Sequence, residues 1–461
     1  MIGVGDVLAA TGGRLAGAAP PAAGFRAVGI DSRTIGEGDL FVAVRGEVHD
    51  GHRFVPDAFA RGAAGALVAT GRAAEFAHLG RPLIEVADPL AALGALAARW
   101  REKFDRLAVV GITGSVGKSS TKELAAALVG ARRRVLKSPK SYNNEYGLPL
   151  SVLQLTPETA VAIFEMGTYG PGELTALAAI ARPTVACVTN VGHSHLERMG
   201  SQAGIAAAKG ELVAALPADG VAVLNGDDPF VRPMAALTHA RVLTYGLGAD
   251  CELRATDVRS EGLVGLTFAL RHGGDTWALE RLPLLGAHSV YTALAAVGVA
   301  LAVGLTPDEA VAGLRAGHTA VRLVLTPGPG SSRLLDDSYN SSPVSSLAAL
   351  GVLAELPARR RLAVLGDMLE LGAYEEQGHR EVGRRVAEVA DELVTIGPRA
   401  RTIADEAARR GLPAARIHPL ADKAAALALL RDELGEGDLA LIKGSRGLAL
   451  EDLVAALGEL A

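Results

Sequence analysis

Gly111-Ile112-Thr113-Gly114-Ser115-Val116-Gly117-Lys118-Ser119-Ser120 is the stretch of sequence that decides the fold of this chain. The apolar run at 107–112 predicts a buried strand, and the residues after the turn predict a helix that runs through Val129. A glycine-rich turn between a strand and a helix aims backbone N–H groups at a bound phosphate. Ile112 occupies the first glycine position of Gly-x-x-x-x-Gly-Lys, whereas the related form Thr-Gly-x-x-Gly-Lys-Ser is complete. We predict a phosphate loop; the alternative is a glycine-rich turn beside a surface lysine.

We expect the residues of this loop to contribute to nucleotide binding in different ways. Residues 113–120 are the candidates for contact with a nucleotide. Lys118 offers a positive charge to the β- and γ-phosphates, and Ser119 offers a hydroxyl to Mg²⁺. A phosphate loop does not by itself identify a reaction, so the neighbouring strand ends have to supply the rest of the site.

Strand and helix patterns alternate on the C-terminal side of the loop. Apolar runs at 161–164, 185–191 and 221–224 predict buried strands with helices between them. This alternation predicts an α/β fold with a mostly parallel sheet that helices cover on both faces. Between residues 251 and 285 the pattern changes to hairpin-like strands with a turn at 271–275, and helices near 287–304 and 307–316 follow.

The length of 461 residues corresponds to about three domains. We expect a small N-terminal α/β domain over 1–105, a central phosphate-loop ATPase-like domain with a parallel sheet over 106–318, and a C-terminal Rossmann-like domain over 319–461. The expected strands of the third domain are at 334–336, 362–365, 393–396 and 439–442. No Gly-x-Gly-x-x-Gly turn follows its first strand, so dinucleotide binding is not indicated.

Composition excludes several classes of protein. With 46 basic and 51 acidic residues, the chain lacks the basic excess of a sequence-independent nucleic-acid binder. The mean hydropathy is +0.26, but the longest apolar stretch, 293–305, is shorter than the roughly 20 residues of a spanning helix. Cys187 and Cys251 are too few for a disulfide framework or a Cys-rich zinc site, and we expect both to be small buried hydrophobes. No basic leader is visible, so we expect a cytoplasmic enzyme that does not span a membrane.

Potential metal ligands follow two of the predicted strands. Glu165 ends the run 161–164, where its carboxylate suits Mg²⁺; the alternative is a solvated glutamate at a strand end. Asn190-Val191-Gly192-His193-Ser194-His195-Leu196-Glu197 ends the next strand and predicts a second metal site or a substrate site. His193 taken alone is typical of an ordinary loop histidine. Lys209, on a predicted helix over 201–216, is typical of a solvated surface charge.

Nine segments in order along nearly the whole chain resemble the motifs of the Mur ligase family, the ATP-dependent amide-forming ligases of peptidoglycan precursor synthesis. They are the phosphate loop, Asn143-Asn144-Glu145-Tyr146-Gly147-Leu148-Pro149, Glu165-Met166-Gly167, 190–197, Ala208-Lys209-Gly210-Glu211, Leu224-Asn225-Gly226-Asp227-Asp228-Pro229, Asp336-Asp337-Ser338-Tyr339-Asn340-Ser341-Ser342-Pro343, 365–372 and Lys443-Gly444-Ser445-Arg446.

The resemblance implies one ligand for each domain. The N-terminal domain would bind the UDP of a muramyl substrate, the central domain ATP, and the C-terminal domain the incoming amine. The matching substrate-binding residues are Ser32, Arg33, Gly46, Asp50, Gly51, Tyr339 and Asn340. Beyond the phosphate loop, the matching ATP-binding residues are Asn144, Asn225, His288, Arg322 and Asp337, of which the last two would meet ATP when the third domain swings in.

The resemblance also implies the catalytic groups, which are Lys118, Glu165, His195 and Lys209. In the family the matching lysine is carbamylated by CO₂, which would turn a cation that repels Mg²⁺ into an anionic oxygen ligand. We expect two Mg²⁺ ions. Ser119 and Glu165 would hold one ion, and His195, Glu165 and carbamylated Lys209 would hold the other.

Three of the segments (143–144, 336–343 and 366–372) resemble the family members that join D-alanyl-D-alanine to UDP-N-acetylmuramoyl-tripeptide. The implied reaction proceeds through an acyl phosphate and releases ADP and phosphate, and we expect a monomer. The first alternative is a sibling that adds lysine or diaminopimelate, although the Asp-Asn-Pro-Arg-type segment of that sibling is missing. A folylpolyglutamate synthetase and a catalytically silent ATP-binding protein are the more distant alternatives.

The sequence departs from the family pattern at two places. Ser289 and Thr292 stand where the family has two Asn residues that help to read adenine. A hydroxyl has a shorter reach than an amide, so adenine recognition is expected to be weaker or differently built. Ser341-Ser342 replaces a frequent Ala-Asn pair on the amine side.

Overall fold

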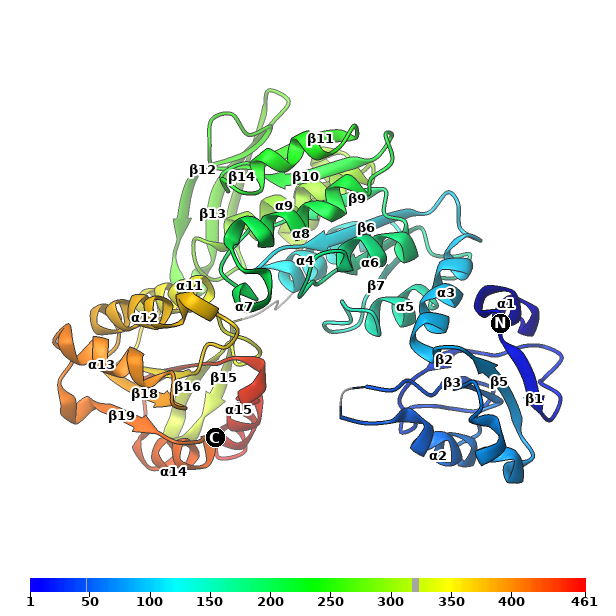
Figure 1. The fold of residues 1–461 in the computed structure, drawn as a ribbon. Helices are drawn as coiled ribbons and strands as arrows, with labels where there is room; N and C mark the ends of the chain where they lie inside the picture. Colours follow the sequence, from blue (N-terminus) through cyan, green and yellow to red (C-terminus); the bar gives the residue numbers. More distant parts are fainter. Residues whose placement is uncertain (47, 317–322) are drawn as a thin grey trace.

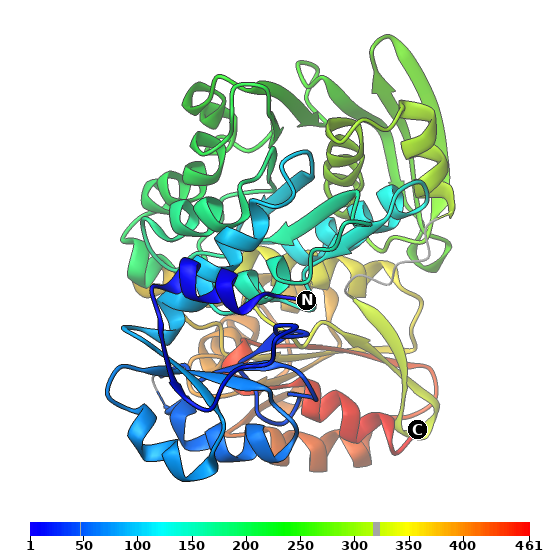
Figure 2. The same ribbon diagram turned by 90° about the vertical axis from the view of Figure 1, so that its right-hand side faces the viewer.

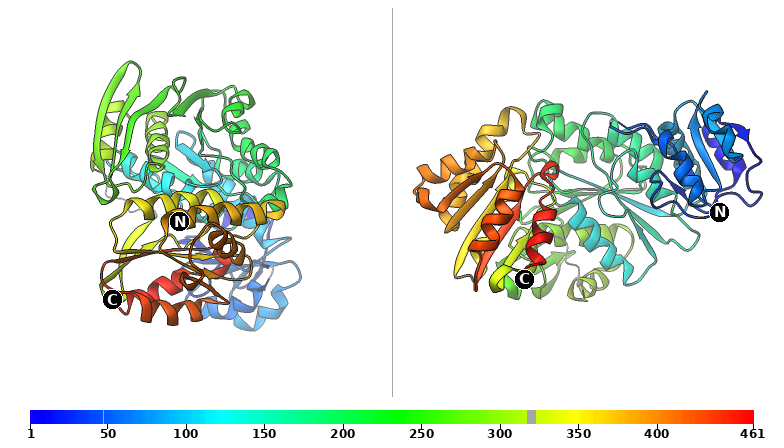
Figure 3. Two further views of the ribbon diagram at one scale, coloured as in Figure 1. Left: turned by 90° about the vertical axis from the view of Figure 1, so that its left-hand side faces the viewer. Right: turned by 90° about the horizontal axis from the view of Figure 1, so that it is seen from below.

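The computed structural model describes residues 1–46, 48–316 and 323–461. Figure 1 shows three α/β domains, each built on its own sheet. The N-terminal and C-terminal domains lie at opposite ends of the molecule, with the central domain between them (Figure 3). The three domains form an arch with the central domain at its top, and the two outer domains both lie below it (Figure 1). In the view of Figure 2, the N-terminal domain therefore stands in front of the C-terminal domain. The predicted three-domain α/β fold is confirmed, while the expected 318/319 boundary falls outside the described residues.

The N-terminal sheet has the order β1-β5-β4-β3-β2, with only β1 antiparallel. Alternate residues of its strands face two different cores. Phe41 packs under α2 and η2, whereas its neighbours Leu40 and Val42 face α1 and α3. The elements are α1 (Val4–Thr11), β1 (Arg14–Gly17), β2 (Val28–Gly29), β3 (Leu40–Val42), η1 (Gly51–Phe54), α2 (Val55–Ala60), β4 (Gly65–Ala69), η2 (Ala73–Leu79), β5 (Pro82–Val86) and α3 (Pro89–Arg101).

The central sheet has nine strands in the order β14-β13-β12-β11-β10-β9-β6-β8-β7, parallel from β12 to β7 and antiparallel in the β12–β13–β14 meander. Its strands are β6 (Ala108–Thr113), β7 (Val135–Lys137), β8 (Val161–Glu165), β9 (Val185–Val188), β10 (Val221–Asn225), β11 (Arg241–Gly246), β12 (Leu253–Ser260), β13 (Leu266–His272) and β14 (Asp275–Leu282). Its helices are α4 (Lys118–Gly130), α5 (Gly147–Val152), α6 (Glu173–Ala181), α7 (Leu196–Met199), α8 (Gln202–Ala214), η3 (Arg232–Leu237), η4 (Gly262–Val264), α9 (Ser289–Ala302) and α10 (Pro307–Ala316).

Helices cover both faces of this sheet, as the alternation predicted. On β6, Val109 belongs to the core under α5, α6 and α8, while Val110 and Ile112 belong to the core under α4, α9 and α10. The apolar stretch 293–305 lies mostly in α9 and is packed inside this second core. In the described part of the chain, no helix has the length and apolar character needed to cross a membrane.

The C-terminal sheet has the order β15-β16-β20-β17-β18-β19, with only β15 antiparallel. Leu362 and Val364 face α14 and α15, while Ala363 and Leu365 face α11, α12 and α13. The elements are β15 (Val324–Gly328), η5 (Pro329–Ser331), β16 (Ser332–Asp336), α11 (Pro343–Glu355), β17 (Arg360–Gly366), η6 (Gly372–Tyr374), α12 (Glu375–Val389), β18 (Glu392–Ile396), α13 (Arg401–Arg409), η7 (Ala414–Arg416), β19 (Ile417–Leu420), α14 (Lys423–Glu433), β20 (Asp438–Lys443), η8 (Arg446–Leu448) and α15 (Glu451–Gly458).

The sequence pattern missed several strands for a common reason. β7, β15 and β19 lie at sheet edges, where partly exposed residues interrupt the apolar pattern. β11 lies inside the central sheet but begins with the exposed Arg241 and carries the half-buried Val242 and Thr244 on one face. The predicted turn at 271–275 is confirmed, since Gly273 and Gly274 both have positive φ between β13 and β14. Cys187 and Cys251 are buried, as expected.

A buried arginine ties the N-terminal helix α3 to the central domain. Arg101, at the end of α3, is only 4% exposed. Its guanidinium donates hydrogen bonds to the carbonyls of Ala181 (2.9 Å), Phe104 (2.6 Å), Leu107 (3.3 Å) and Arg182 (3.4 Å). Two of these carbonyls belong to the end of α6, so one side chain joins two domains.

We expect Arg101→Met to lower the free energy of unfolding by about 2–4 kcal/mol, because unsatisfied buried carbonyls cost about 1–3 kcal/mol each. Urea denaturation followed by the fluorescence of the adjacent Trp100 would measure the loss. Arg99→Met on the same helix is the control, since Arg99 is exposed and pairs with exposed Glu102. That control should change stability by less than about 0.5 kcal/mol, and equal effects of the two variants would contradict the assignment.

Candidate active site

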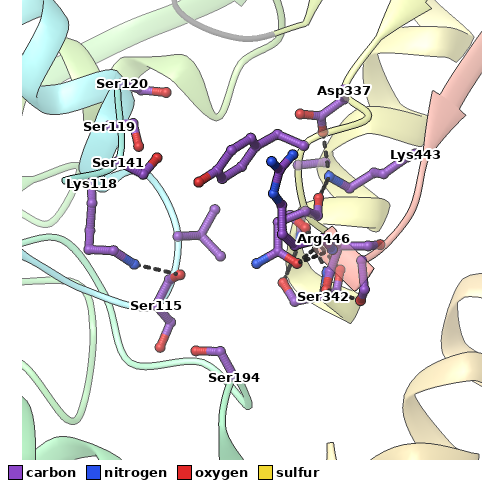
Figure 4. A pocket seen from close by; sticks show the side chains of 18 of the residues that line it. Ser115, Lys118, Ser119, Ser120, Ser141, Ser194, Asp337, Ser342, Lys443 and Arg446 are labelled. Carbon is purple, nitrogen blue, oxygen red and sulfur yellow. Dashed lines mark hydrogen bonds and ion pairs between the residues drawn. The ribbon is translucent and has the colours of Figure 1, made fainter. Parts of the chain in front are cut away.

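A cavity of about 580 Å³ lies between the central and C-terminal domains. Figure 4 shows Lys118, Ser119 and Ser120 on one side of it and Asp337, Lys443 and Arg446 on the other. The lining residues of the central domain are 115–120, Ser141, Asn143, Asn144, Glu165, 167–169, Ser194, His195, Lys209, 283–285, His288, Ser289 and Thr292. Those of the C-terminal domain are 323–325, Asp337, 339–342, Ser345, Ala348, 369–371, Lys443 and 445–447.

The phosphate loop has the backbone that its glycines predict. Gly114 has φ +146° and lies so close to Thr189 that a Cβ on it would be 1.8 Å from Thr189 Oγ1, so only glycine fits. Gly117 has φ +88° immediately before α4. The Lys118 ammonium donates a hydrogen bond to the carbonyl of Gly114 at 2.6 Å, so the side chain folds back onto the backbone of the loop. The alternative of a lysine projecting from the surface is wrong.

Asn190, at the end of β9, holds the loop in shape. Its Oδ1 accepts from the N–H of Val116 (2.9 Å), and its Nδ2 donates to the carbonyl of Val116 (2.8 Å). Thr189 Oγ1 donates to the same carbonyl at 2.7 Å, and Gly192 N donates to Ser115 Oγ at 2.8 Å. The loop geometry therefore depends on a neighbouring strand end about 75 residues further along the chain.

Glu165 is a buried carboxylate without a cationic partner among the described residues. It ends β8 and is 2% exposed, so the alternative of a solvated glutamate is wrong. Its Oε2 accepts from Ser119 Oγ at 2.7 Å, and its Oε1 accepts from Asn143 Nδ2 at 2.7 Å. Both donors are neutral, so the fold surrounds a buried negative charge with hydrogen bonds but leaves the charge itself uncompensated.

Lys209 is a buried amine on α8. It is 3% exposed and lines the cavity, so the expectation of a surface charge is wrong. Burial, and secondarily the charge of Lys118, lowers the pKa of Lys209 well below its ordinary value. None of the described residues pairs with its ammonium group, and the lowered pKa shifts Lys209 toward the neutral, nucleophilic amine.

His195 contacts the C-terminal domain. Its Nδ1 pairs with Oε2 of Glu370, which lies in the turn after β17. The ring of Tyr169 packs edge-on against its imidazole, with centroids 4.5 Å apart. His193, predicted as an ordinary loop histidine, stacks on the ring of Tyr374 with centroids 3.8 Å apart, so an aromatic contact joins the same two domains in addition to the pair of His195 and Glu370.

The C-terminal wall carries two cations with different surroundings. Lys443 is buried at the end of β20 and pairs with Asp337, and it donates to the carbonyl of Asn340 at 2.8 Å. Arg446 is 60% exposed along its side chain and lies 5.1 Å from the centre of the Tyr339 ring. No individual role was predicted from the sequence for Glu370, Lys443 or Arg446, although each lies in a segment that resembles a family motif.

The departures from the family pattern lie on the cavity wall. Ser289 Oγ donates to the carbonyl of Leu285 at 2.6 Å, so that hydroxyl is engaged within its own helix start. Thr292 lines the same wall. His288 is next to them, and burial lowers its pKa from the ordinary histidine value. Ser342 caps α11 with its side chain, so the Ser341-Ser342 pair lies at the start of that helix.

Several residues predicted to bind ATP lie away from the cavity or are engaged in the fold. Asn225 bridges strands, with its Nδ2 donating to the carbonyl of Thr189 at 2.9 Å, and it does not line the cavity. Thr113, at the end of β6, and Gly114, in the phosphate loop, do not line the cavity either. Asn144 lines the cavity and accepts from Gly147 N at 3.0 Å at the start of α5. Arg322 lies outside the described residues.

The predicted substrate residues of the N-terminal domain form a separate group, and none of them lines the cavity. Gly46 N donates to the carbonyl of His49 at 2.8 Å, and Gly51 N donates to the carbonyl of Val44 at 2.9 Å. Burial opposes ionisation of Asp50, but hydrogen bonds from His52 and Arg72 lower the pKa of Asp50 to about 2.

Ser32 and Arg33 belong to another turn of the same domain. Ser32 is buried, whereas Arg33 is exposed and forms an ion pair with Asp31 at 2.8 Å. The two turns therefore offer a fixed carboxylate and an exposed guanidinium on the N-terminal domain, apart from the cavity.

No group of three or more His, Cys, Asp or Glu side chains with metal-binding geometry occurs within residues 1–46, 48–316 and 323–461. The predicted ligands Ser119 and Glu165 are in direct contact, and His195 and Lys209 line the same cavity. A site for a cation there would need the hydroxyl of Ser119 and a modified Lys209 in addition to the carboxylate and the imidazole.

The chain matches known proteins over each domain. Residues 25–101 match the Mur ligase family catalytic domain, residues 112–300 the Mur ligase middle domain, and residues 322–446 the Mur ligase glutamate ligase domain. The UDP-N-acetylmuramoyl-tripeptide–D-alanyl-D-alanine ligase of Bacillus subtilis (strain 168) is 35% identical over 430 residues, which are 93% of this chain and 92% of the relative.

Two solved structures resemble the whole molecule. MurF from Acinetobacter baumannii superposes with a TM-score of 0.86 at 29% identity, over 99% of this chain and 98% of that one. The MurF ligase from Thermotoga maritima in complex with ADP superposes with a TM-score of 0.77 at 28% identity, over 94% of this chain and 97% of that one. The chain therefore belongs to the Mur ligase family.

Proposed function

We propose that this protein is an ATP-dependent amide ligase that joins D-alanyl-D-alanine to UDP-N-acetylmuramoyl-tripeptide. One observation carries the proposal: a phosphate loop, an uncompensated buried carboxylate and a buried amine with a lowered pKa line one cavity, which a second domain closes. The names of the full-length relatives supply the substrates. The sibling that adds lysine or diaminopimelate is the alternative.

The phosphate loop would hold the β- and γ-phosphates of ATP. Its backbone N–H groups and the start of α4 provide donors, and the Lys118 ammonium adds a positive charge. The γ-phosphate would then lie beside Ser119 and Glu165, which are already joined by a hydrogen bond. Asp337, together with Arg322, would approach the nucleotide from the C-terminal domain.

The residues of the cavity fit Mg²⁺. Glu165 is a buried anion with only neutral donors around it, and a divalent cation would supply the missing positive charge. Ser119 and Glu165 would hold one ion, and Glu165, His195 and carbamylated Lys209 would hold a second. When bound, the ions neutralise charge on the phosphate and on the substrate carboxylate.

Lys209 is suited to carbamylation. The neutral amine nitrogen attacks the carbon of CO₂, a new N–C bond forms, and one proton leaves to water. The lowered pKa keeps the nitrogen lone pair available for this step. The product is an anion, so the modification replaces an amine that burial disfavours in its charged form by a group that a metal ion can stabilise.

Amide formation requires two displacements. A carboxylate oxygen of the bound tripeptide attacks the γ-phosphorus, and the bond from phosphorus to the ADP oxygen breaks, which produces an acyl phosphate. The amine of D-alanyl-D-alanine then attacks the acyl carbon and loses a proton, and phosphate leaves. The protein contributes positioning and charge neutralisation without a covalent intermediate of its own.

The outer domains would hold the two reactants. The turns that contain Ser32, Arg33, Gly46, Asp50 and Gly51 would bind the UDP-sugar end of the muramyl substrate. Tyr339 and Asn340, on the C-terminal wall, would contact the incoming dipeptide. Because the wall closes the cavity over the phosphate loop, water would be kept away from the acyl phosphate.

Release of ADP in the presence of UDP-muramyl-tripeptide tests the proposal. We expect D-alanyl-D-alanine to stimulate release, since the dipeptide consumes the acyl phosphate. Free lysine and free diaminopimelate are the control amines. Stimulation by a free amino acid alone would favour the sibling reaction, and release without any dependence on an amine would refute the ligase assignment.

We predict that Lys118→Ala weakens ATP binding by roughly 10- to 100-fold, because a hydrogen bond to a charged group contributes about 1.5–3 kcal/mol. Isothermal titration calorimetry with a non-hydrolysable ATP analogue would measure the change. Lys137→Ala is the matched control, since Lys137 is half exposed and pairs with Glu123 outside the cavity. Unchanged affinity in the Lys118 variant would contradict the role of the loop.

We predict that Lys209→Ala abolishes turnover and that bicarbonate does not restore it. Wild-type protein depleted of CO₂ should regain activity with bicarbonate, and the recovery should diminish as the pH falls through the lowered pKa of Lys209, because the protonated amine does not react.

Lys209→Met serves as the control for folding, because it keeps a buried stem and removes the cost of a buried charge. We expect it to be as inactive as the alanine variant and no less stable than the CO₂-depleted wild type in urea denaturation. Normal turnover in either variant would exclude the carbamate.

A further inference from the structure

Two residues with left-handed backbones meet where the central and C-terminal domains touch. His195 has φ +60° just before α7, and Glu370 has φ +64° in the turn after β17. Neither is glycine, so the surrounding structure has to hold each of them in this unfavourable conformation. The N–H of Glu197 donates to the carbonyl of Glu370 at 3.4 Å, which joins the two turns through their backbones.

The contact between the side chains determines the tautomer of His195. Glu370 Oε2 is bonded to Nδ1 of His195, and the two side chains form an ion pair or a hydrogen bond across the domain boundary. An ionised carboxylate only accepts hydrogen bonds, so Nδ1 carries the proton. In the described part of the chain no group bonds to Nε2, which leaves its lone pair available.

Aromatic groups fix the orientation of the imidazole. Tyr169 packs against it edge-on, with ring planes at 67°. The guanidinium of Arg198 lies 5.6 Å from the centre of the Tyr169 ring and supports that ring in turn. The stacked pair of His193 and Tyr374, with planes at 13°, adds a second side-chain contact between the two domains.

We propose that Glu370 is a positioning residue for His195, supplied by the neighbouring domain. It fixes the Nδ1–H tautomer, so that His195 presents an unprotonated Nε2 to a cation in the cavity while the two domains are docked. The inference rests on the proposed function, in which His195 is a ligand of Mg²⁺. A carboxylate that accepts from the distal nitrogen of a ligating histidine orients the ring and increases its basicity.

The arrangement couples cation binding to domain docking. If docking of the C-terminal domain prepares His195 for the cation, then the bound cation must favour the docked domains by the same factor. The cation site is then complete only when the C-terminal wall, which carries the proposed dipeptide-binding residues, is docked. Phosphoryl transfer would therefore take place only when the site for the dipeptide is also in place.

Nitrogen-15 NMR of the imidazoles in the full-length, metal-free protein tests the tautomer. The His195 signal is identified by its loss in His195→Gln, and spectra are taken about two pH units above the ordinary histidine pKa of about 6.5. We expect Nδ1–H in the wild type and in Glu370→Gln, whose amide oxygen also accepts. Glu370→Ala should move His195 toward the Nε2–H form that free imidazole prefers.

Glu355→Ala is the matched control. Glu355 accepts from Ser260 and so joins the same two domains without touching His195. This variant should keep the wild-type tautomer. An Nε2 proton on His195 in the wild type, or the same tautomer in the wild type and in Glu370→Ala, would overturn the inference.

The Mg²⁺ dependence of ADP release provides the second readout. We expect Glu370→Ala to need roughly 10- to 100-fold more Mg²⁺, Glu370→Gln to lie closer to the wild type, and Glu355→Ala to match it. If Glu370→Ala and Glu355→Ala raised the Mg²⁺ requirement equally, Glu370 would act only as a contact between the domains, and its positioning role would be refuted. Absence of dipeptide-stimulated ADP release in the wild type would refute the proposed function instead, while the NMR result would stand by itself.

Discussion

Two buried groups of opposite charge type share one cavity without neutralising each other, and the rest of the structure is arranged around them. Glu165 has only neutral hydrogen-bond donors, and Lys209 has no partner among the described residues. Leaving a charge buried and unpaired is expensive. In this fold the unpaired groups lie together in the cavity. The proposed Mg²⁺ would supply a positive charge to Glu165, and the proposed carbamate would give Lys209 a metal ion as its partner.

The parallel sheet explains why these groups come together. β6, β8 and β9 are neighbours and run in the same direction, so their carboxyl ends open at one edge of the sheet. That edge receives the phosphate loop from β6, Glu165 from β8 and Asn190 after β9. The helix α8 packs on the same sheet and brings Lys209 to the cavity.

The C-terminal domain closes the cavity and also contributes side chains that contact residues of the central domain. Glu370 reaches His195, and Tyr374 stacks on His193, so the docked domain touches the residues that follow β9. Lys443 and Arg446 bring positive charge to the wall opposite the phosphate loop. The reacting groups of the three proposed substrates would therefore meet at a domain boundary, where closure and chemistry depend on the same contacts.

Local sequence was enough to determine the α/β alternation, the phosphate loop and the acidic residue at the end of β8, because strand periodicity and glycine-dependent turns are properties of short segments. It could not predict edge strands such as β7 and β15, whose pairing partners, rather than their own apolar pattern, keep them extended. The local pattern around Lys209 is typical of a surface charge, and only the family resemblance predicted this residue as part of the site, since burial depends on what packs over a helix. The pairing of His195 with Glu370, 175 residues apart, was decided only by the docking of two domains, because no local pattern encodes which distant side chain fills the space beside an imidazole.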